Sequence, residues 1–328
     1  MTCPSTLCAV VSDIHFPHHH RAGWEAFLAW CRDNRPRRVV INGDGLDFEA
    51  LSRFAKTPEN VHAIDEIKVM VYEVNRLAAV CGEVFYQEGN HDERWSGIVA
   101  AVAIHLKGAI GLTLEEQCRF QGLDARVRWV REDVHNLGTQ IGPFRIRHGH
   151  KQSKGFGPKH ISATRLAKSM GHNEIVGHHH RAQLMCQTAF GKMAIAIANP
   201  SLTAPHAYAP GADWQSGFTV VECFGDDATA YPVVMTLDGR FAWGGRVYDG
   251  KPANDVQPSR TPGHAPEVDT SGLYFDDDET TATVRPAGEA PSIAEHARRE
   301  GVDESTVRKW AQKHQRPWQD YRRAKGAA

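Results

Sequence analysis

Five short apolar segments of the chain each end in residues that can bind metal ions. The segment 39–42 runs into Gly43-Asp44-Gly45-Leu46-Asp47, a turn with two carboxylates three positions apart. In an open α/β sheet, ligands collect at the carboxyl ends of the strands. Imidazole nitrogens with carboxylate and amide oxygens suit divalent cations such as Mn, Fe or Zn, so we expect a metal site assembled around Asp44. The other four segments lead into Asp13-Ile14-His15, Gly89-Asn90-His91-Asp92, His148-Gly149-His150 and Gly177-His178-His179-His180.

Two patterns of strands and helices must position these residues. In the first part of the chain, strands at 7–12, 39–42 and 83–87 alternate with helices at 24–32 and 64–77. This alternation predicts parallel strands with helices packed on the faces of the sheet. Further helices are expected at 98–110 and 161–169. The remaining segments are short and alternating, and we expect them to form a second, more antiparallel sheet from 127–130, 144–147, 183–188, 192–198, 217–224 and 231–236.

Charge and proline content divide the 328 residues into three parts. Residues 1–248 carry all five motifs and a net charge of about +1, and we expect them to form one domain. Residues 249–290 contain five prolines and a net charge of −6, which predicts a flexible acidic linker unable to bury a core. Residues 291–328 have a net charge of +4 and are expected to form a small all-α module.

Composition also bears on location and on the class of metal. No stretch approaches the roughly 20 apolar residues that cross a bilayer, so no membrane partner is expected. The seven cysteines are scattered and odd in number, which indicates reduced thiols in a cytoplasmic protein. Since no Cys-x-x-Cys pair is present, zinc ligation by cysteine is not expected.

Together the motifs resemble the five-motif pattern of the calcineurin-like metallophosphoesterases. The matching residues, which span positions 13 to 180, are Asp13-x-His15, Gly43-Asp44-x-x-Asp47, Gly89-Asn90-His91-Asp92, His148 and Gly177-His178-x-His180. The resemblance implies an α/β fold, a four-layer α/β/β/α sandwich, that holds two divalent metal ions. Residues 12–17, and Asp47-Phe48 with Ser52-Arg53-Phe54, look similar to a subgroup of this family that is frequent in phages and prophages.

The resemblance also assigns roles. His91 would be the general acid, oriented by Asp47, and a metal-bound hydroxide would attack the phosphate ester. Two bound cations repel each other, so a shared carboxylate between them fits the physics of such a centre. The residues leave two alternatives open, with Asp92 in place of Asp47 as the orienting group and His150 in place of His148 as ligand. One metal would be bound by Asp13, His15, Asp44 and His180, and the other by Asp44, Asn90, His148 and His178.

Basic residues follow several of the motifs. Arg94 and Arg181 each lie directly behind a ligand motif, and Lys151 and Lys154 lie in a glycine-punctuated loop after His148. We expect these four side chains to contact the phosphate groups of a substrate, although a solvated basic loop would have the same sequence. The histidines at 18–20 and His179 are expected to be solvated loop residues near the site.

The last part of the chain resembles a helix-turn-helix. Ser292 would cap the first helix, with Glu295 completing a capping box, and Gly301 would supply the turn. Such motifs place the start of their second helix in the major groove of DNA. The alternative is a helical module that docks on a partner protein. The residues expected to contact DNA are Ser305, Thr306, Arg308 and Lys309.

The sequence therefore predicts a dinuclear-metal phosphoesterase that hydrolyses a phosphodiester, with nucleic acid as the substrate class that the basic module suggests. One alternative is a phosphomonoesterase or protein phosphatase. Another is a DNA-binding regulator with a structural metal domain, which the presence of His91 disfavours because a structural site needs no acid. No oligomeric state is predicted.

Overall fold

The computed structural model describes residues 5–52, 62–103, 105, 109–131, 138–151, 172–189, 191–204 and 212–250. The expected module, and all of the expected linker except residues 249 and 250, lie outside this part of the chain. The helix expected at 161–169 and Lys154 also lie outside it. The boundaries drawn at 248 and 290 therefore stay predictions.

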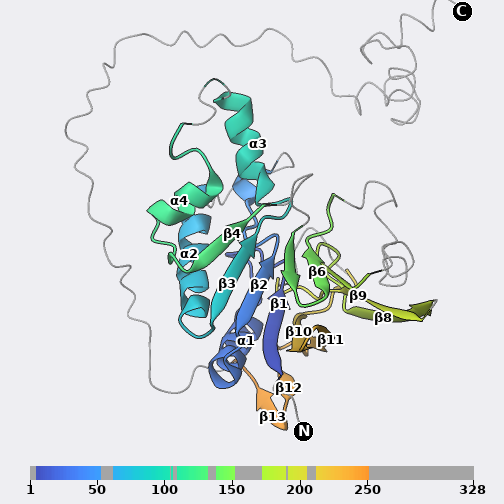
Figure 1. Ribbon diagram of the computed structural model, residues 1–328. Coiled ribbons are helices and arrows are strands. Elements are labelled where there is room, and N and C mark those ends of the chain that lie inside the picture. Colours follow the sequence, from blue (N-terminus) through green and yellow to red (C-terminus); the bar gives the residue numbers. More distant parts are fainter. Residues whose placement is uncertain are drawn as a thin grey trace, which may run out of the picture. The chain divides into compact units, whose positions relative to one another are not determined.

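The first sheet has six strands in the order β11-β10-β1-β2-β3-β4 (Figure 1). Strands β1 to β4 run parallel, whereas β10 pairs antiparallel with β1 and β11 antiparallel with β10. The helices α1 (Arg21–Asn34) and α2 (Ala63–Ala78) connect β1 to β2 and β2 to β3. Such crossovers bring the carboxyl ends of β1, β2 and β3 to one edge. The strands are β1 (Thr6–Val11), β2 (Arg38–Asn42), β3 (Glu83–Gln87), β4 (Val127–Val130), β10 (Gly217–Phe224) and β11 (Asp227–Val234).

The second sheet has five strands in the order β5-β6-β7-β9-β8. Its three central strands are parallel, and β5 and β8 pair antiparallel at the two edges. The strands are β5 (Thr139–Ile141), β6 (Phe144–Arg147), β7 (Glu174–Val176), β8 (Gln183–Ala189) and β9 (Lys192–Ala198). A separate hairpin pairs β12 (Phe241–Trp243) with β13 (Arg246–Tyr248).

The division of strands between the sheets corrects one prediction. The segments 127–130, 217–224 and 231–236 were expected in the second sheet, but they lie in the first as β4, β10 and β11. Alternation of apolar residues shows that a segment is a strand without showing which strand it pairs with. Buried neighbours on both faces of β10, with Phe218 toward the helices and Val221 toward the second sheet, are typical of a strand inside a sandwich.

The helices differ from prediction at their ends. The helix expected at 98–110 is α3 (Glu93–Val102), which begins directly after the turn 89–92. The structure adds α4 (Leu114–Phe120), which Thr113 and Glu116 start with a capping box, and a 3-10 turn η1 (Glu49–Leu51). No helix within the described ranges is long and apolar enough to cross a membrane.

Two apolar cores separate three layers. Ala9 and Val11 of β1 pack toward the helices with Trp24 and Phe27 of α1. The alternate residue Val10 faces the second sheet, in the core that contains Ile146, because successive side chains of a strand point to opposite faces. The predicted α/β class is confirmed, with two sheets packed face to face and helices on the outer face of the first sheet. The described residues contain no helical layer on the second sheet, so the fourth predicted layer stays a prediction.

Candidate metal centre

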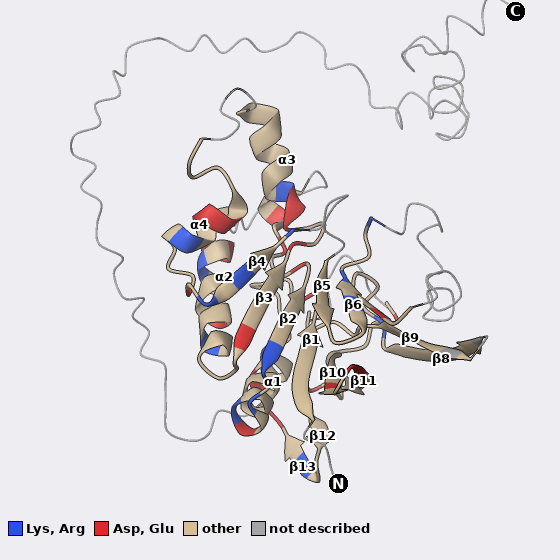
Figure 2. Cartoon of the chain, in the orientation of Figure 1, with Lys and Arg blue, Asp and Glu red and all other residues tan. Residues whose placement is uncertain are grey.

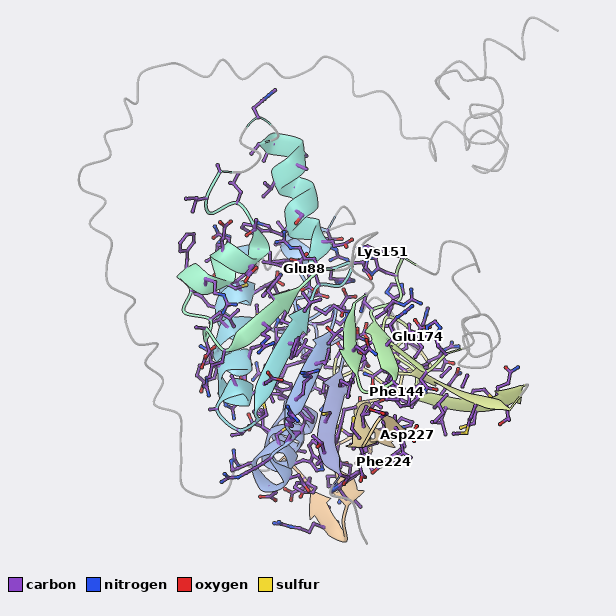
Figure 3. All side chains as sticks on the ribbon, in the orientation of Figure 1. Glu88, Phe144, Lys151, Glu174, Phe224 and Asp227 are labelled. Atoms are coloured by element: carbon purple, nitrogen blue, oxygen red, sulfur yellow. The ribbon has the colours of Figure 1, made fainter. Side chains whose placement is uncertain are left out.

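The predicted ligands gather where strands of both sheets end. Asp13, Asp44 and Asn90 follow β1, β2 and β3 of the first sheet, and His148 and His178 follow β6 and β7 of the second. Figure 3 labels two residues of this end of the molecule, Glu88 and Lys151, one beyond each sheet. The centre is thus built by both sheets.

Their ligand atoms form three overlapping clusters, in each of which the atoms lie within 4.8 Å of one another. Asp44 belongs to two clusters and His15 to two, so the three groups form one continuous set. A divalent ion needs several oxygen or nitrogen ligands around one point. The cluster with Asp13 and the cluster with His148 offer two such points, and the middle cluster joins them through His15 and Asp44. The clusters are Asp13 with His15 and His180, His15 with Asp44 and His91, and Asp44 with His148 and His178.

Asp44 is buried at the centre of the set. Its Oδ2 lies 3.1 Å from His148 Nε2, and its Oδ1 accepts the backbone N–H of His91 at 2.7 Å. Burial alone would raise the pKa of this carboxyl, but the charges of His148 and His91 hold its pKa well below the usual range. The side chain is therefore an ionised carboxylate, which is the form that binds a cation.

His148 directs its Nε2 at the Asp44 carboxylate. Its Nδ1 lies 2.9 Å from the backbone oxygen of Asn42, which can only accept, so Nδ1 carries the proton. Its Nε2 faces Asp44 Oδ2 at 3.1 Å and Asn90 Oδ1 at 3.2 Å. Burial alone would lower the pKa of His148, but the carboxylates of Asp44 and Asp13 raise it to about 10, so in the metal-free protein Nε2 holds a proton that faces these oxygens. A divalent ion would take the place of that proton, so the donor set fits a metal ion.

The structure distinguishes the two histidines that the sequence left open. His150 Nε2 lies 3.2 Å from Glu93 Oε2, and His150 belongs to none of the clusters around Asp44. Of this pair, only His148 is brought together with Asp44 and His178.

The Asn42 carbonyl belongs to a polar bridge between the sheets. The Asn42 side chain donates to the backbone oxygen of Arg147 at 3.0 Å, and it accepts from Gln87 Nε2 at 3.0 Å. Gln87 Oε1 in turn accepts the backbone N–H of Thr139 at 2.9 Å. These bonds tie β2 and β3 to β5 and β6 directly behind His148. Sequence reasoning passed over Asn42 and Gln87 because a polar residue at a strand end has many uses.

The backbone at the centre is strained. Asp13, His15, Asp44, His178 and His180 all have positive φ, at 54°, 56°, 50°, 67° and 54°. A residue other than glycine in this region costs about 1–3 kcal/mol, and such residues cluster at functional sites. The surroundings hold the strained turns in place. The N–H of His178, for example, donates to both carboxylate oxygens of Asp13 at 3.1 and 3.0 Å.

Glycine is required where the loops approach most closely. A Cβ added at Gly89 would lie 2.3 Å from Asp44 Oδ1 and 2.9 Å from His148 Nε2. Gly89 therefore lets the turn that carries Asn90 and His91 pass directly over Asp44.

Asp47 supports two histidines at once. Its Oδ1 accepts from His15 Nδ1 at 2.8 Å and lies 3.3 Å from His91 Nδ1. The backbone oxygen of Asp47 lies 2.8 Å from the same nitrogen of His91. Asp47 is thus positioned to orient His91, as the sequence suggested, and it also fixes His15. It lies within 4.8 Å of His18 and Glu49 in a further cluster of possible ligands at the rim.

His91 belongs to the cluster with His15 and Asp44, and most of its side chain is buried. Burial alone would lower its pKa, but the charge of Asp44 and the hydrogen bond with Asp47 outweigh burial and raise the pKa above its ordinary value. Arg94 Nη2 lies 3.1 Å from His91 Nε2. Because a guanidinium can only donate, Nε2 accepts in this arrangement, and Arg94 must move away when Nε2 takes a proton.

Asp92, the alternative partner of His91, has a different role. Its Oδ1 accepts from the Tyr86 hydroxyl at 2.8 Å and from the backbone N–H of Leu46 at 3.1 Å, and its Oδ2 accepts the backbone N–H of Gly89 at 2.8 Å. Asp92 therefore joins the turn after β2 to the turn after β3 without a hydrogen bond to His91 among the described contacts.

The predicted substrate contacts have partners within the protein. Arg94 Nη1 donates to the backbone oxygens of Asp47 and Phe48 at 2.8 and 3.1 Å. Lys151 Nζ lies 2.7 Å from Glu93, and Arg181 lies 2.7 Å from Asp213. Of these three, Arg94 is the one that contacts the candidate acid.

Two histidines near the site are not the solvated residues that the sequence suggested. His19 is only 8% exposed, and its ring packs against Phe16. His20 Nδ1 accepts the backbone N–H of Gly23 at 3.1 Å, so it caps α1. A run of three histidines conceals these roles, because capping by histidine has no strong sequence signal.

No protein-family model matches the chain, and no curated protein matches its sequence. Among solved structures, wild-type Vps29 from Entamoeba histolytica, complexed with Zn²⁺, is 18% identical, covers 74% of this chain and 96% of its own, and has a TM-score of 0.39. Vps29 from Cryptosporidium parvum is 14% identical over 74% and 94% of the two chains, with a TM-score of 0.38. Purple acid phosphatase PPD1 from yellow lupin is 11% identical over 76% and 53%, with a TM-score of 0.37. At TM-scores below 0.5, the chemistry must be argued from this chain's own residues.

Proposed function

We propose that the chain is a metallophosphoesterase that hydrolyses a phosphate ester with two divalent metal ions. The observation that carries this proposal is the set of three overlapping ligand clusters, linked through His15 and Asp44, one of which contains His91. Asp13, His15 and His180 would hold one ion, Asn90, His148 and His178 the other, and Asp44 would contact both. Bound ions at this place would supply Lewis acidity, which polarises a phosphoryl group and acidifies water.

The protein's own residues would supply the proton and its position. The alkoxide that leaves a phosphate ester needs a proton, and His91 is a suitable donor because its pKa is raised above the ordinary value. The Asp47 carbonyl accepts from His91 Nδ1, so Nε2 is the nitrogen that can hold the proton for the leaving group. Arg94 lies 3.1 Å from Nε2. A phosphate oxygen bound at this place would accept hydrogen bonds from Arg94 and from protonated Nε2.

We also infer that the protein is cytoplasmic. We further infer that its substrate is a phosphodiester. The support for a diester is indirect and comes from the basic module predicted at 291–328, which would hold nucleic acid near the site. A phosphomonoesterase or protein phosphatase would use the same ions, and a DNA-binding regulator would use them only structurally.

Two chromogenic substrates separate these functions. We expect the protein, stripped of metal and reloaded with Mn²⁺, to hydrolyse bis-p-nitrophenyl phosphate faster than p-nitrophenyl phosphate. The reverse preference would indicate a monoesterase. No turnover of either substrate with Mn²⁺, Fe²⁺ or Zn²⁺, in protein that binds two ions per chain, would contradict an enzymatic role.

Removal of residues 291–328 tests the nucleic-acid part separately. The shortened chain should keep its turnover of bis-p-nitrophenyl phosphate, because every proposed ligand lies before residue 181. Its affinity for DNA should fall, and the dependence of binding on salt should become shallower, since fewer phosphates are neutralised. Equal DNA affinity of the full and shortened chains across a salt series would exclude the module as the DNA contact.

A further inference from the structure

Three arginines line a hollow at the end of the first sheet opposite the candidate metal centre. Arg32 lies in the last turn of α1, Arg35 directly follows this helix, and Arg37 precedes β2. The other wall is formed by residues 79–82, which follow α2, and the hollow has a volume of about 370 Å³. Figure 2 labels α1 and β2, the two elements that flank the arginines of this hollow. We call this feature the arginine hollow.

The three arginines of the hollow are exposed, and within the described part of the chain only the charge of Glu83 acts on one of them, Arg37, without an ion pair. None of its three guanidinium groups makes a hydrogen bond or an ion pair there. The acidic side chains of the adjoining segments are paired with other arginines. Asp33 contacts Arg246 at 3.0 Å, and Glu83 contacts Arg38 at 3.0 Å and Arg128 at 3.1 Å.

A simpler role for these arginines would be to neutralise the partial negative charge at the C-termini of α1 and α2. Both α1 and α2 end at the hollow, and each helix C-terminus carries an effective charge of about −0.5. Three guanidinium groups bring three positive charges, so about two remain after both helix ends are counted. The helix ends therefore offset only about a third of the charge, and the hollow keeps a net positive charge that attracts anions.

The shape and chemistry of the hollow indicate the class of anion. Guanidinium groups present planar pairs of N–H donors that match phosphate oxygens. A volume of about 370 Å³ is within the range of small-molecule sites, which is roughly 300–1,000 Å³. A concave site of this size suits a compact ligand better than an extended nucleic-acid backbone.

We propose that the arginine hollow binds a small anion with at least two phosphate groups. Inorganic pyrophosphate and a nucleoside diphosphate share this chemistry. The site is separate from the candidate metal centre, so this proposal does not depend on the proposed phosphoesterase activity.

Calorimetric titration of the full chain, with metal removed by chelating resin, tests the proposal. The probes are pyrophosphate and ADP, each at low and at moderate salt. The test variant is R32Q/R37Q, which keeps Arg35 because its backbone has a φ of 45°. The control variant R21Q/R240Q removes the same charge from exposed positions outside the hollow.

We expect the wild-type chain to bind pyrophosphate and the dissociation constant to rise at least tenfold in R32Q/R37Q. It should change less than twofold in R21Q/R240Q. Equal affinity for the two probes identifies the phosphates as the whole ligand, and tighter binding of ADP adds the nucleoside. Turnover of bis-p-nitrophenyl phosphate by R32Q/R37Q should equal that of the wild type, which separates this site from the metal centre.

Two results would overturn the proposal. One is equal weakening of pyrophosphate binding in both double variants, which would reflect general charge. The other is binding that appears only after Asp276, Asp277 and Asp278 are replaced with Asn. That result would make the chain's own acidic segment the occupant of the arginine hollow.

Discussion

Asp92→Asn tests whether Asp92 joins the two turns or orients the candidate acid. In the wild type, Asp92 accepts hydrogen bonds from Leu46, Tyr86 and Gly89, and all of these contacts are buried. The asparagine keeps one oxygen for Tyr86 and Leu46, but it places an amide group opposite the N–H of Gly89. The N–H of Gly89 then loses its acceptor and faces the N–H donors of the new amide, which costs about 1–3 kcal/mol.

Urea unfolding followed by tryptophan fluorescence measures this loss as a fall in the free energy of unfolding of the metal-free protein. Tyr86→Phe removes one of the three bonds and should cost about 1 kcal/mol. Because both changes act on one carboxylate, the double variant should lose less than the sum. Asp226→Asn, at an exposed turn, is the matched control and should change the free energy by less than about 0.5 kcal/mol.

Turnover distinguishes the two roles. At full metal occupancy, Asp92→Asn should reduce kcat less than Asp47→Asn, because only Asp47 contacts His91 directly. Our reasoning would be refuted if Asp92→Asn left the free energy of unfolding unchanged and yet lowered kcat as much as Asp47→Asn.

Two further predictions concern the candidate acid and a buried carboxyl. His91→Ala should lower kcat about 10²–10⁴-fold while two metal ions per chain remain bound by elemental analysis, and unchanged turnover would remove His91 from the mechanism. Burial raises the pKa of Glu66, which accepts the N–H of Phe48, to about 8 from an ordinary 4.5. The folded protein thus holds a proton that the unfolded chain releases, so stability should fall as the pH rises from about 5 to 9. Glu66→Gln should remove this slope and be more stable than the wild type at pH 9, by less than about 5 kcal/mol, in chemical unfolding across pH; an unaltered slope would assign the pH dependence to other groups.

The sequence predicted much of the first sheet because its signals are local. Strands β1, β2 and β3 each combine an apolar run with a polar turn, and helices between them require parallel pairing. The partners of β4 and β10 could not be predicted in this way. Pairing is decided by which apolar faces meet, and that depends on contacts between residues far apart in the chain.

For the candidate site too, the features set by local sequence could be predicted, and those set by contacts between distant residues could not. The ligand types were visible as Asp, Asn and His at strand ends, and the structure brings them together. The role of Asp92 was not visible, because Asp47 and Asp92 are equally suited by type to orient a histidine. Only the paths of the two turns show that Asp92 faces Leu46 and Gly89 while Asp47 faces His91.

The division of the ligands between two sheets has a mechanical consequence. Asp13, Asp44 and Asn90 follow strands of one sheet, and His148 and His178 follow strands of the other. A bound ion would therefore cross-link the two sheets at this end of their interface. An ion that binds only the closed arrangement strengthens it in proportion to its affinity. Without the ion, the two sheets would be held together at this end by the hydrogen bonds of Asn42 and Gln87, and we expect their interface to loosen here first.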